Sequence, residues 1–185
     1  MKLILLSLLL TIASLFAADG PTLTLEALKF TAPTGWIDVP VTSPMRKATW
    51  RTSAEPSHTR QPHDLSSQGQ SDAAEISFFA FGKDQGGSVS ENIQRWFSQF
   101  SESAAKGQSA TVNVNNRTIT FAKSEGTFTS GMPGGPTTPL PDYALCGAII
   151  ETESGAIFIK MTGPKATIAK LEKTFTELVT TAAKS

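Results

Sequence analysis

The sequence has one cysteine, two histidines and no excess of charge of either sign, and each shortage argues against a class of protein. Among its 185 residues, 16 are basic and 16 are acidic. Nucleic acids and anionic membranes attract proteins with a basic excess, so this balance argues against both as partners. The lone Cys146 has no second cysteine with which to form an intramolecular disulfide. The fold must therefore be held together by its core.

Residues suited to catalysis or metal binding are equally sparse. His58 and His63 share a polar segment, spaced as H-x4-H and without a fixed third ligand, so we expect no zinc site. A Ser-His-Asp triad would need its base from that same segment, and the G-x-S-x-G motif of many hydrolases is absent. Cys146 lies in the apolar run YALCGAII, which predicts a buried, unreactive thiol. We expect no catalytic site, no cofactor and no metal.

The first 18 residues have the layout of a secretory signal peptide. Lys2 provides a positive start, an apolar stretch follows, and Ala17 and Ala18 are small residues at the expected cleavage point. The apolar stretch is shorter than the about 20 residues of a membrane-spanning helix. The sequence therefore predicts an exported protein, periplasmic or extracellular, with no stable membrane anchor once the leader is cleaved. Residues 19–185 would form a single domain.

Three segments predict an antiparallel sheet. The stretch AEISFFAFG, residues 74–82, is apolar on both faces, which is typical of an interior strand. ATVNVNNRTITF reads as a hairpin that turns at Asn115 and Asn116, and YALCGAIIETESGAIFIK as a hairpin that turns near Gly155.

Other segments read as turns and loops. The sequence APTGW predicts a turn at Pro33–Gly35 within a first hairpin, followed by a strand in MRKATWRTS. Residues 53–74 are polar and rich in serine, so they predict a mobile loop. Residues 131–142, GMPGGPTTPLPD, contain too many prolines and glycines for regular structure and predict a second loop.

Apolar residues recur at three- and four-residue steps in two segments, which predicts two amphipathic helices on the sheet. These residues are Val89, Ile93, Trp96, Phe97 and Phe100 in the first helix, and Ile168, Leu171, Phe175, Leu178 and Val179 in the second. The predicted fold class is therefore α+β, an antiparallel sheet sandwiched by amphipathic helices.

The glycine-rich stretch GKDQGGSVSE before the first helix raises the question of phosphate binding. A P-loop needs its lysine after the second glycine, whereas Lys83 precedes Gly86 and Gly87. Ser88 and Glu91 instead have the spacing of a capping box. The stretch is predicted to join a strand to a helix.

The solvent side of the first helix is the candidate partner-binding surface. Arg95 lies opposite the apolar stripe, and Asn92 and Gln99 are expected to flank it toward solvent. Such a polar face is often only solvated, but a partner can dock there. The loop at 131–142 is the second candidate contact.

The order of elements resembles the PsbP-like superfamily, whose fold is shared with DcrB-type exported bacterial proteins. The resemblance rests on FTAPTGWIDVP and on IFIKMTGPKATIAKLEKTF, where the last strand runs into the closing helix. MRKATW and AEISFFAFGKDQGGSVSENIQRWFSQF are also similar to uncharacterised exported bacterial proteins. The resemblance implies an α/β/α sandwich and a protein that binds or positions other macromolecules, with no catalytic residues to carry over.

Two functions remain open at this point. The first is an exported, non-catalytic domain that binds or stabilises another envelope or periplasmic protein. The second is a carrier of a lipid or metabolite, with an apolar pocket between sheet and helices near Trp36 and Trp50, although strand tryptophans more often fill a core.

Overall fold

The computed structural model describes residues 20–41, 43–53, 72–101, 107–130 and 138–185. The predicted leader, both histidines and most of the predicted 53–74 loop lie outside these residues. The strands are β1 (Thr22–Leu25), β2 (Leu28–Thr31), β3 (Ile37–Val39), β4 (Ala48–Arg51), β5 (Glu75–Gly82), β6 (Gln108–Val114), β7 (Arg117–Ser130), β8 (Thr138–Thr152) and β9 (Gly155–Pro164). The helices are α1 (Val89–Phe97) and α3 (Lys165–Lys184). Neither of these helices has the length and apolar composition needed to cross a membrane.

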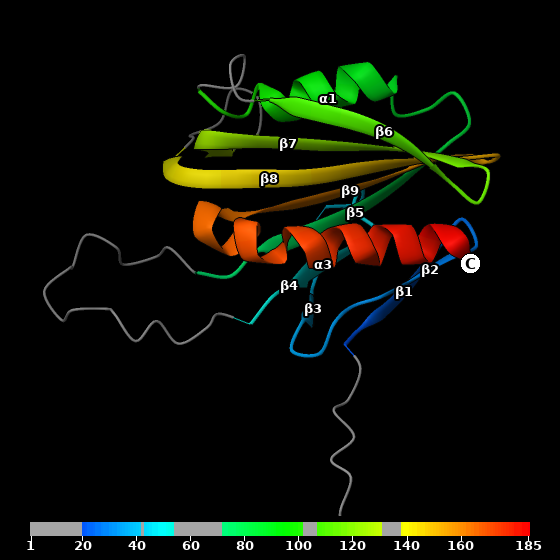
Figure 1. Cartoon of the computed structure of the whole chain (residues 1–185), viewed down its shortest axis with the longest axis horizontal. Coiled ribbons are helices and arrows are strands. Elements are labelled where there is room, and N and C mark those ends of the chain that lie inside the picture. The colour runs from blue at the N-terminus through cyan, green and yellow to red at the C-terminus, as the bar shows by residue number, and fades with distance from the viewer. Residues whose placement is uncertain (1–19, 42, 54–71, 102–106, 131–137) are drawn as a thin grey trace, which may run out of the picture.

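Seven strands form one antiparallel sheet in the order β3-β4-β5-β9-β8-β7-β6, and β1 and β2 form a separate hairpin. Helix α1 lies on one face of the large sheet, and α3 lies on the other (Figure 1). The predicted α+β sandwich is therefore confirmed. The predicted interior strand is β5, which lies between β4 and the middle strand β9.

The larger part of the core lies between the sheet and α3. Phe175 and Val179 of α3 are buried there, together with Leu28 and Phe30 of the β1–β2 hairpin. Trp50 is 1% exposed and contacts the ring of Phe78 edge-on, with ring centres 4.5 Å apart. This side of the sheet is apolar because α3 and the small hairpin cover it together.

A smaller core lies under α1. Ile93 and Trp96 of the helix pack there with Leu145, Ile149 and Phe158 of the sheet. Phe100 was predicted to lie in this helix but follows its end, where it forms an isolated bridge with Phe128. Because α1 has only nine residues, it covers part of its face and leaves the rest to polar side chains.

Two turns form where the sequence predicts them. Asn115 and Asn116 join β6 to β7 with φ angles of 48° and 61°, and Gly155 follows the β8–β9 turn with φ 148°. Asparagine and glycine adopt such left-handed backbone at lower cost than other residues do.

The predicted first hairpin is wrong. The turn at Pro33–Gly35 exists, but it joins β2 to β3, which belong to different sheets. The hairpin is β1–β2, and it turns at Glu26 and Ala27, both at positive φ. Neither residue type favours that backbone, so the sequence carried no local signal for this turn.

The predicted loop at 131–142 is partly wrong. Residues 131–137 lie outside the described residues, but β8 begins at Thr138 and pairs with β7 from there. Its prolines are tolerated because β9 ends opposite Tyr143, so the first residues of β8 have a neighbour on one side only.

Candidate functional site

The glycine-rich stretch before α1 is a helix start, as predicted. The Ser88 side chain accepts from the backbone N–H of Glu91, and the Glu91 carboxylate accepts from the backbone N–H of Ser88 at 2.8 Å. The carboxylate also accepts from the Ser88 hydroxyl at 2.7 Å, and the two hydrogen bonds that it accepts, the backbone one first, lower the pKa of Glu91 from its usual value. Gly86 and Gly87 turn the chain at φ 83° and 79°. The capping carboxylate therefore occupies the place where an anion would bind.

The three residues predicted to form one outward surface point in different directions. Asn92 is 4% exposed, so the expectation that it faces solvent is wrong. Its side-chain amide donates to the carbonyl oxygens of Gly86 and Ser88 at 2.8 and 2.9 Å, which fixes the glycine turn to the helix. Asn92 therefore has a structural role.

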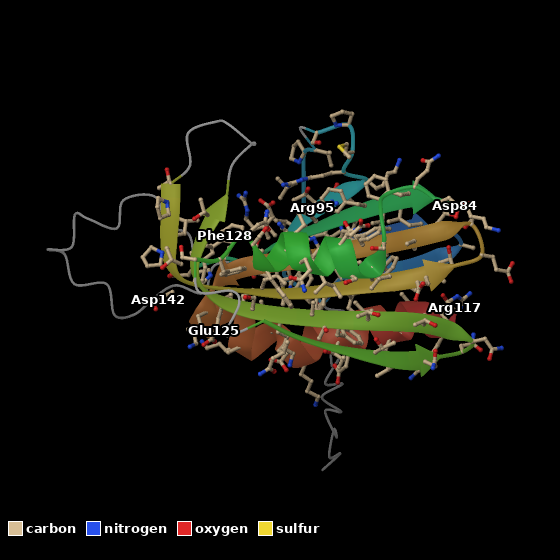
Figure 2. All side chains as sticks on the ribbon, turned by 90° about the horizontal axis from the view of Figure 1, so that it is seen from above. Asp84, Arg95, Arg117, Glu125, Phe128 and Asp142 are labelled. Atoms are coloured by element: carbon tan, nitrogen blue, oxygen red, sulfur yellow. The ribbon has the colours of Figure 1, made fainter. Side chains whose placement is uncertain are left out.

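Arg95 is exposed, as predicted, and donates to the side-chain oxygen of Asn92 at 3.1 Å. Gln99 follows the end of α1 and is partly buried, because its side chain turns toward the sheet. There its Oε1 accepts a hydrogen bond from Nζ of Lys160 at 3.0 Å. Figure 2 shows Arg95 on the side of α1 near the β3–β4 connection, and Phe128 beyond the C-terminal end of the helix.

Lys160 belongs to a row of side chains that crosses the sheet beneath α1. The register places Thr49 opposite Ser77, Ser77 opposite Lys160, and Lys160 opposite Gly147. The ring of Trp96 lies over Gly147, where a Cβ atom would come within 2.3 Å of it. The helix thus covers the row as far as Gly147, and the row turns polar at Lys160, where this cover ends.

The polar end of this row forms what we call the Lys160 cluster: Arg46, Glu75, Ser77, Gln99, Phe128 and Lys160. Nζ of Lys160 lies 5.7 Å from the centre of the Phe128 ring, a cation–π distance. Glu75 accepts from Arg46 at 2.8 Å and from Ser77 at 3.4 Å. Two cations and one carboxylate therefore share the cluster, which has a net positive charge.

The environment of Lys160 disfavours its charged form. The pKa of Lys160 is lowered from 10.5 to about 8, first by burial and then by the nearby Arg46, while Glu75 acts in the opposite direction. Within the described residues, Gln99 is its only hydrogen-bond acceptor and no carboxylate forms an ion pair with it. The hydroxyl of Thr49, in the same row, is buried and has no hydrogen-bond partner within the described residues. The cluster can thus accept an anionic group from outside.

Sequence reasoning missed Lys160, although the pattern IFIKMTG held a signal. Side chains alternate along a strand, so Lys160 shares a face with Phe158, two positions earlier. A lysine on the apolar face of an interior strand is uncommon. Arg46 and Glu75 gave no such signal, because their contact spans 29 positions.

On the opposite face, a groove of about 390 Å³ lies between α3 and strands β7 and β8. Lys123 pairs with Glu172 across it, and Lys165 pairs with Glu125 at 2.8 Å. Cys146 is 4% exposed there, which confirms the predicted buried thiol. Burial raises its pKa to about 11, so the thiolate needed for reactivity is scarce.

Trp36 and Trp50, near which a carrier pocket was considered, are 6% and 1% exposed. Their rings contact each other edge-on, with centres 6.5 Å apart. They fill core, and neither lines the groove beside α3. No three His, Cys, Asp or Glu side chains of the described ranges come together as a metal site.

No protein-family model matches the sequence, and no curated protein matches it either. Among solved structures, it is similar to cyanobacterial PsbP (CyanoP) from Synechocystis sp. PCC 6803, with a TM-score of 0.50 and 11% identity over 91% of this chain and 94% of that one. It is also similar to PA94 from Pseudomonas aeruginosa, described as a protein of unknown function and putative regulator. That match has a TM-score of 0.38 and 9% identity over 87% of this chain and 94% of that one. The protein has a PsbP-like fold, as the sequence resemblance implied.

Proposed function

We propose that this protein is an exported, non-catalytic domain that binds another envelope protein, which places a carboxylate at the Lys160 cluster. Export is supported by the leader-like sequence of residues 1–18. A binding role is supported by the resemblance to PsbP-like proteins, which implies domains that bind or position other macromolecules. Fold alone does not define function, so the surface must carry the argument.

The observation that carries the proposal is the pairing within the Lys160 cluster. The ammonium of Lys160 is partly buried and has a neutral acceptor, Gln99, while the carboxylate of Glu75 is held by Arg46. Burying a charge without a partner of opposite charge is costly. An acidic side chain from a partner would relieve that cost through a charge-assisted hydrogen bond, which is stronger than a neutral one.

Arg95 extends the positive surface outward from this cluster. It is exposed on α1 between the buried Asn92 and the sheet-facing Gln99. Exposed charges at the rim of an interface act mainly on the association rate and its salt dependence. Arg95 would therefore steer an acidic partner, and Lys160 would anchor it.

The test is a crosslinking capture from the host's envelope fraction with three forms of the protein. We expect the native protein to capture a partner, Lys160→Met to lose it, and Lys173→Met to retain it, since the side chain of Lys173 is 87% exposed on α3. Lys160→Met keeps an unbranched side chain of similar length and removes the ammonium group, with its charge and its hydrogen bond to Gln99. Equal capture by Lys160→Met and the native protein would reject the cluster as the anchor. No capture by any form would contradict the binding function itself.

A fourth form, Arg95→Glu, tests the steering role. We expect it to slow capture at low salt and to differ less from the native protein at high salt, where screening shortens the range of charges. Gln99→Lys is unsuitable as a further variant, because it would place a second ammonium beside that of Lys160 and disturb the cluster itself.

A further inference from the structure

The two edges of the seven-stranded sheet differ in how they are protected. At one edge, β3 has three residues, one of them Asp38, and Pro40 follows it directly. Short length, charge and proline are the common means by which proteins keep a sheet edge from pairing with another chain. At the other edge, β6 has seven residues, QSATVNV, with neither charge nor proline.

Strand β6 is regular and accessible. It pairs with β7 through seven consecutive residue pairs without a register shift, from Gln108 to Val114. Its first six residues are exposed and Val114 is partly exposed. Figure 2 shows β6 as the outermost strand on the side of the sheet away from the β3–β4 connection. Its outer backbone groups are therefore available to a further strand.

The side chains of β6 differ between its two faces. Ala110 and Val112 lie opposite Phe121 and Ile119 of β7, and Ile119 belongs to the core under α3. On the other face, Thr111 lies opposite Thr120, and the two hydroxyls are 3.2 Å apart. The strand thus has one face that is apolar from Ala110 through Val112 to Val114, with Gln108 at its start, and a polar face of Ser109, Thr111 and Asn113.

We propose that β6 pairs with the β6 strand of a second copy, antiparallel and about a two-fold axis at Thr111, so that two sheets join into one. Such an axis is perpendicular to the sheet. The apolar face of one β6 strand therefore continues into the apolar face of the other, and the polar face into the polar face. It places Ala110 opposite the partner's Val112 and Thr111 opposite the partner's Thr111. Apolar side chains therefore meet on one face and hydroxyls on the other, both favourable cross-strand pairs.

Two further observations favour a second copy. Beside β6, Lys123 is paired with Glu172, and Arg117 is held by the carbonyl oxygen of Ala183 at 2.7 Å. Since β6 itself bears no charge, pairing it with an identical strand brings no like charges of Gln108–Val114 directly opposite each other. Pairing β6 with itself also uses the same edge of both copies and leaves β3 outside, so that the assembly closes at two copies.

Thr111 offers a charge-swap test. Two lysines or two glutamates at position 111 would lie directly opposite each other across the axis, where like charges destabilise a pair. We expect the native protein to be a dimer in sedimentation equilibrium, and both Thr111→Lys and Thr111→Glu to raise its dissociation constant on the order of tenfold or more. An equimolar mixture of the two variants should recover dimers, because opposite charges then face each other.

Both variants lose the Thr111–Thr120 contact equally, so the recovery cannot come from folding. Thr181→Lys and Thr181→Glu, on an exposed position of α3, are the matched controls and should dimerise as the native protein does. Lys160→Met should also leave the dimer intact, which separates this surface from the one proposed for the envelope partner. A native protein that stays monomeric throughout would overturn the proposal, as would a dimer that both Thr111 variants preserve or a mixture that recovers none.

Discussion

The ammonium of Lys160 and the side-chain oxygen of Gln99 are joined by a 3.0 Å hydrogen bond that ties the middle strand of the sheet to the end of α1. This bond turns Gln99 toward the sheet and gives Lys160 its only acceptor within the described residues. It connects the helix from which a partner surface was predicted to a cationic site that the sequence analysis did not single out.

Removing either member of this bond should have opposite effects on stability. Gln99→Leu leaves the ammonium without its acceptor and should lower the free energy of unfolding by about 1–3 kcal/mol. Lys160→Met removes the partly buried charge and should leave stability unchanged or raise it by about 1–2 kcal/mol. Urea unfolding of both variants and the double variant measures the coupling, and Gln99→Leu should cost less in the Lys160→Met background. Equal costs in both backgrounds would mean that the bond contributes nothing.

The lowered pKa of Lys160 makes stability depend on pH in a defined window. Below pH 8 the lysine is protonated in both the folded and unfolded states, and the folded state bears the cost of its burial. Between about pH 8 and 10.5 the folded protein releases this proton while the unfolded chain keeps it. Since the unfolded state then binds more protons, stability rises with pH.

Relative to Lys160→Met, the native protein should therefore gain up to about 3 kcal/mol across this window. In this comparison the contributions of the other titrating groups to the pH dependence cancel, because both proteins share those groups. Arg46 favours the neutral amine and Glu75 the charged one, so Arg46→Met should move the window to higher pH and Glu75→Gln to lower pH. Parallel stability curves for the native protein and Lys160→Met would contradict the lowered pKa.

Gly147 is the position on the sheet over which the Trp96 ring of α1 packs. A methyl group there would come within 2.3 Å of the Trp96 ring. Gly147→Ala should therefore displace the ring and destabilise the protein by about 1–3 kcal/mol, the usual cost of overpacking a core. Near-ultraviolet circular dichroism should change together with the urea midpoint. Gly82→Ala is the control, because its added carbon would have no neighbour closer than 3.7 Å. Similar losses of stability in both variants would argue against a close contact between Trp96 and Gly147.

Cys146 should be inert in the folded protein. Its thiol is 4% exposed and has a pKa of about 11, so little thiolate exists at pH 8 and reagents have poor access to it. We expect no reaction with a chromogenic disulfide in buffer and complete reaction in denaturant. Rapid labelling of the native protein would show that the sheet opens between β8 and α3.

Local signals in the sequence were sufficient for most elements. The steps from Ile168 to Val179 marked α3, Ser88 and Glu91 marked the start of α1, and Asn115 and Asn116 marked a hairpin turn. Each of these depends on residues a few positions apart, whose preferences hold in almost any fold. Two elements lacked such a local signal. The turn at Glu26 and Ala27 uses residues without a turn preference. Strand β8 begins in a proline-containing segment, which is tolerated because its backbone pairs there with β7 alone.

The sequence by itself determined the class of fold, the buried Cys146 and the capped helix. Only the tertiary structure decided which side chains meet on the sheet. The direction of Gln99 depends on how α1 is seated through Trp96 on Gly147, and the exposure of β6 depends on its place at the end of the strand order. Both follow from pairings between residues tens of positions apart, which helical and strand periodicity do not encode. The Lys160 cluster exists because β4, β5 and β9 lie side by side where the cover from α1 ends.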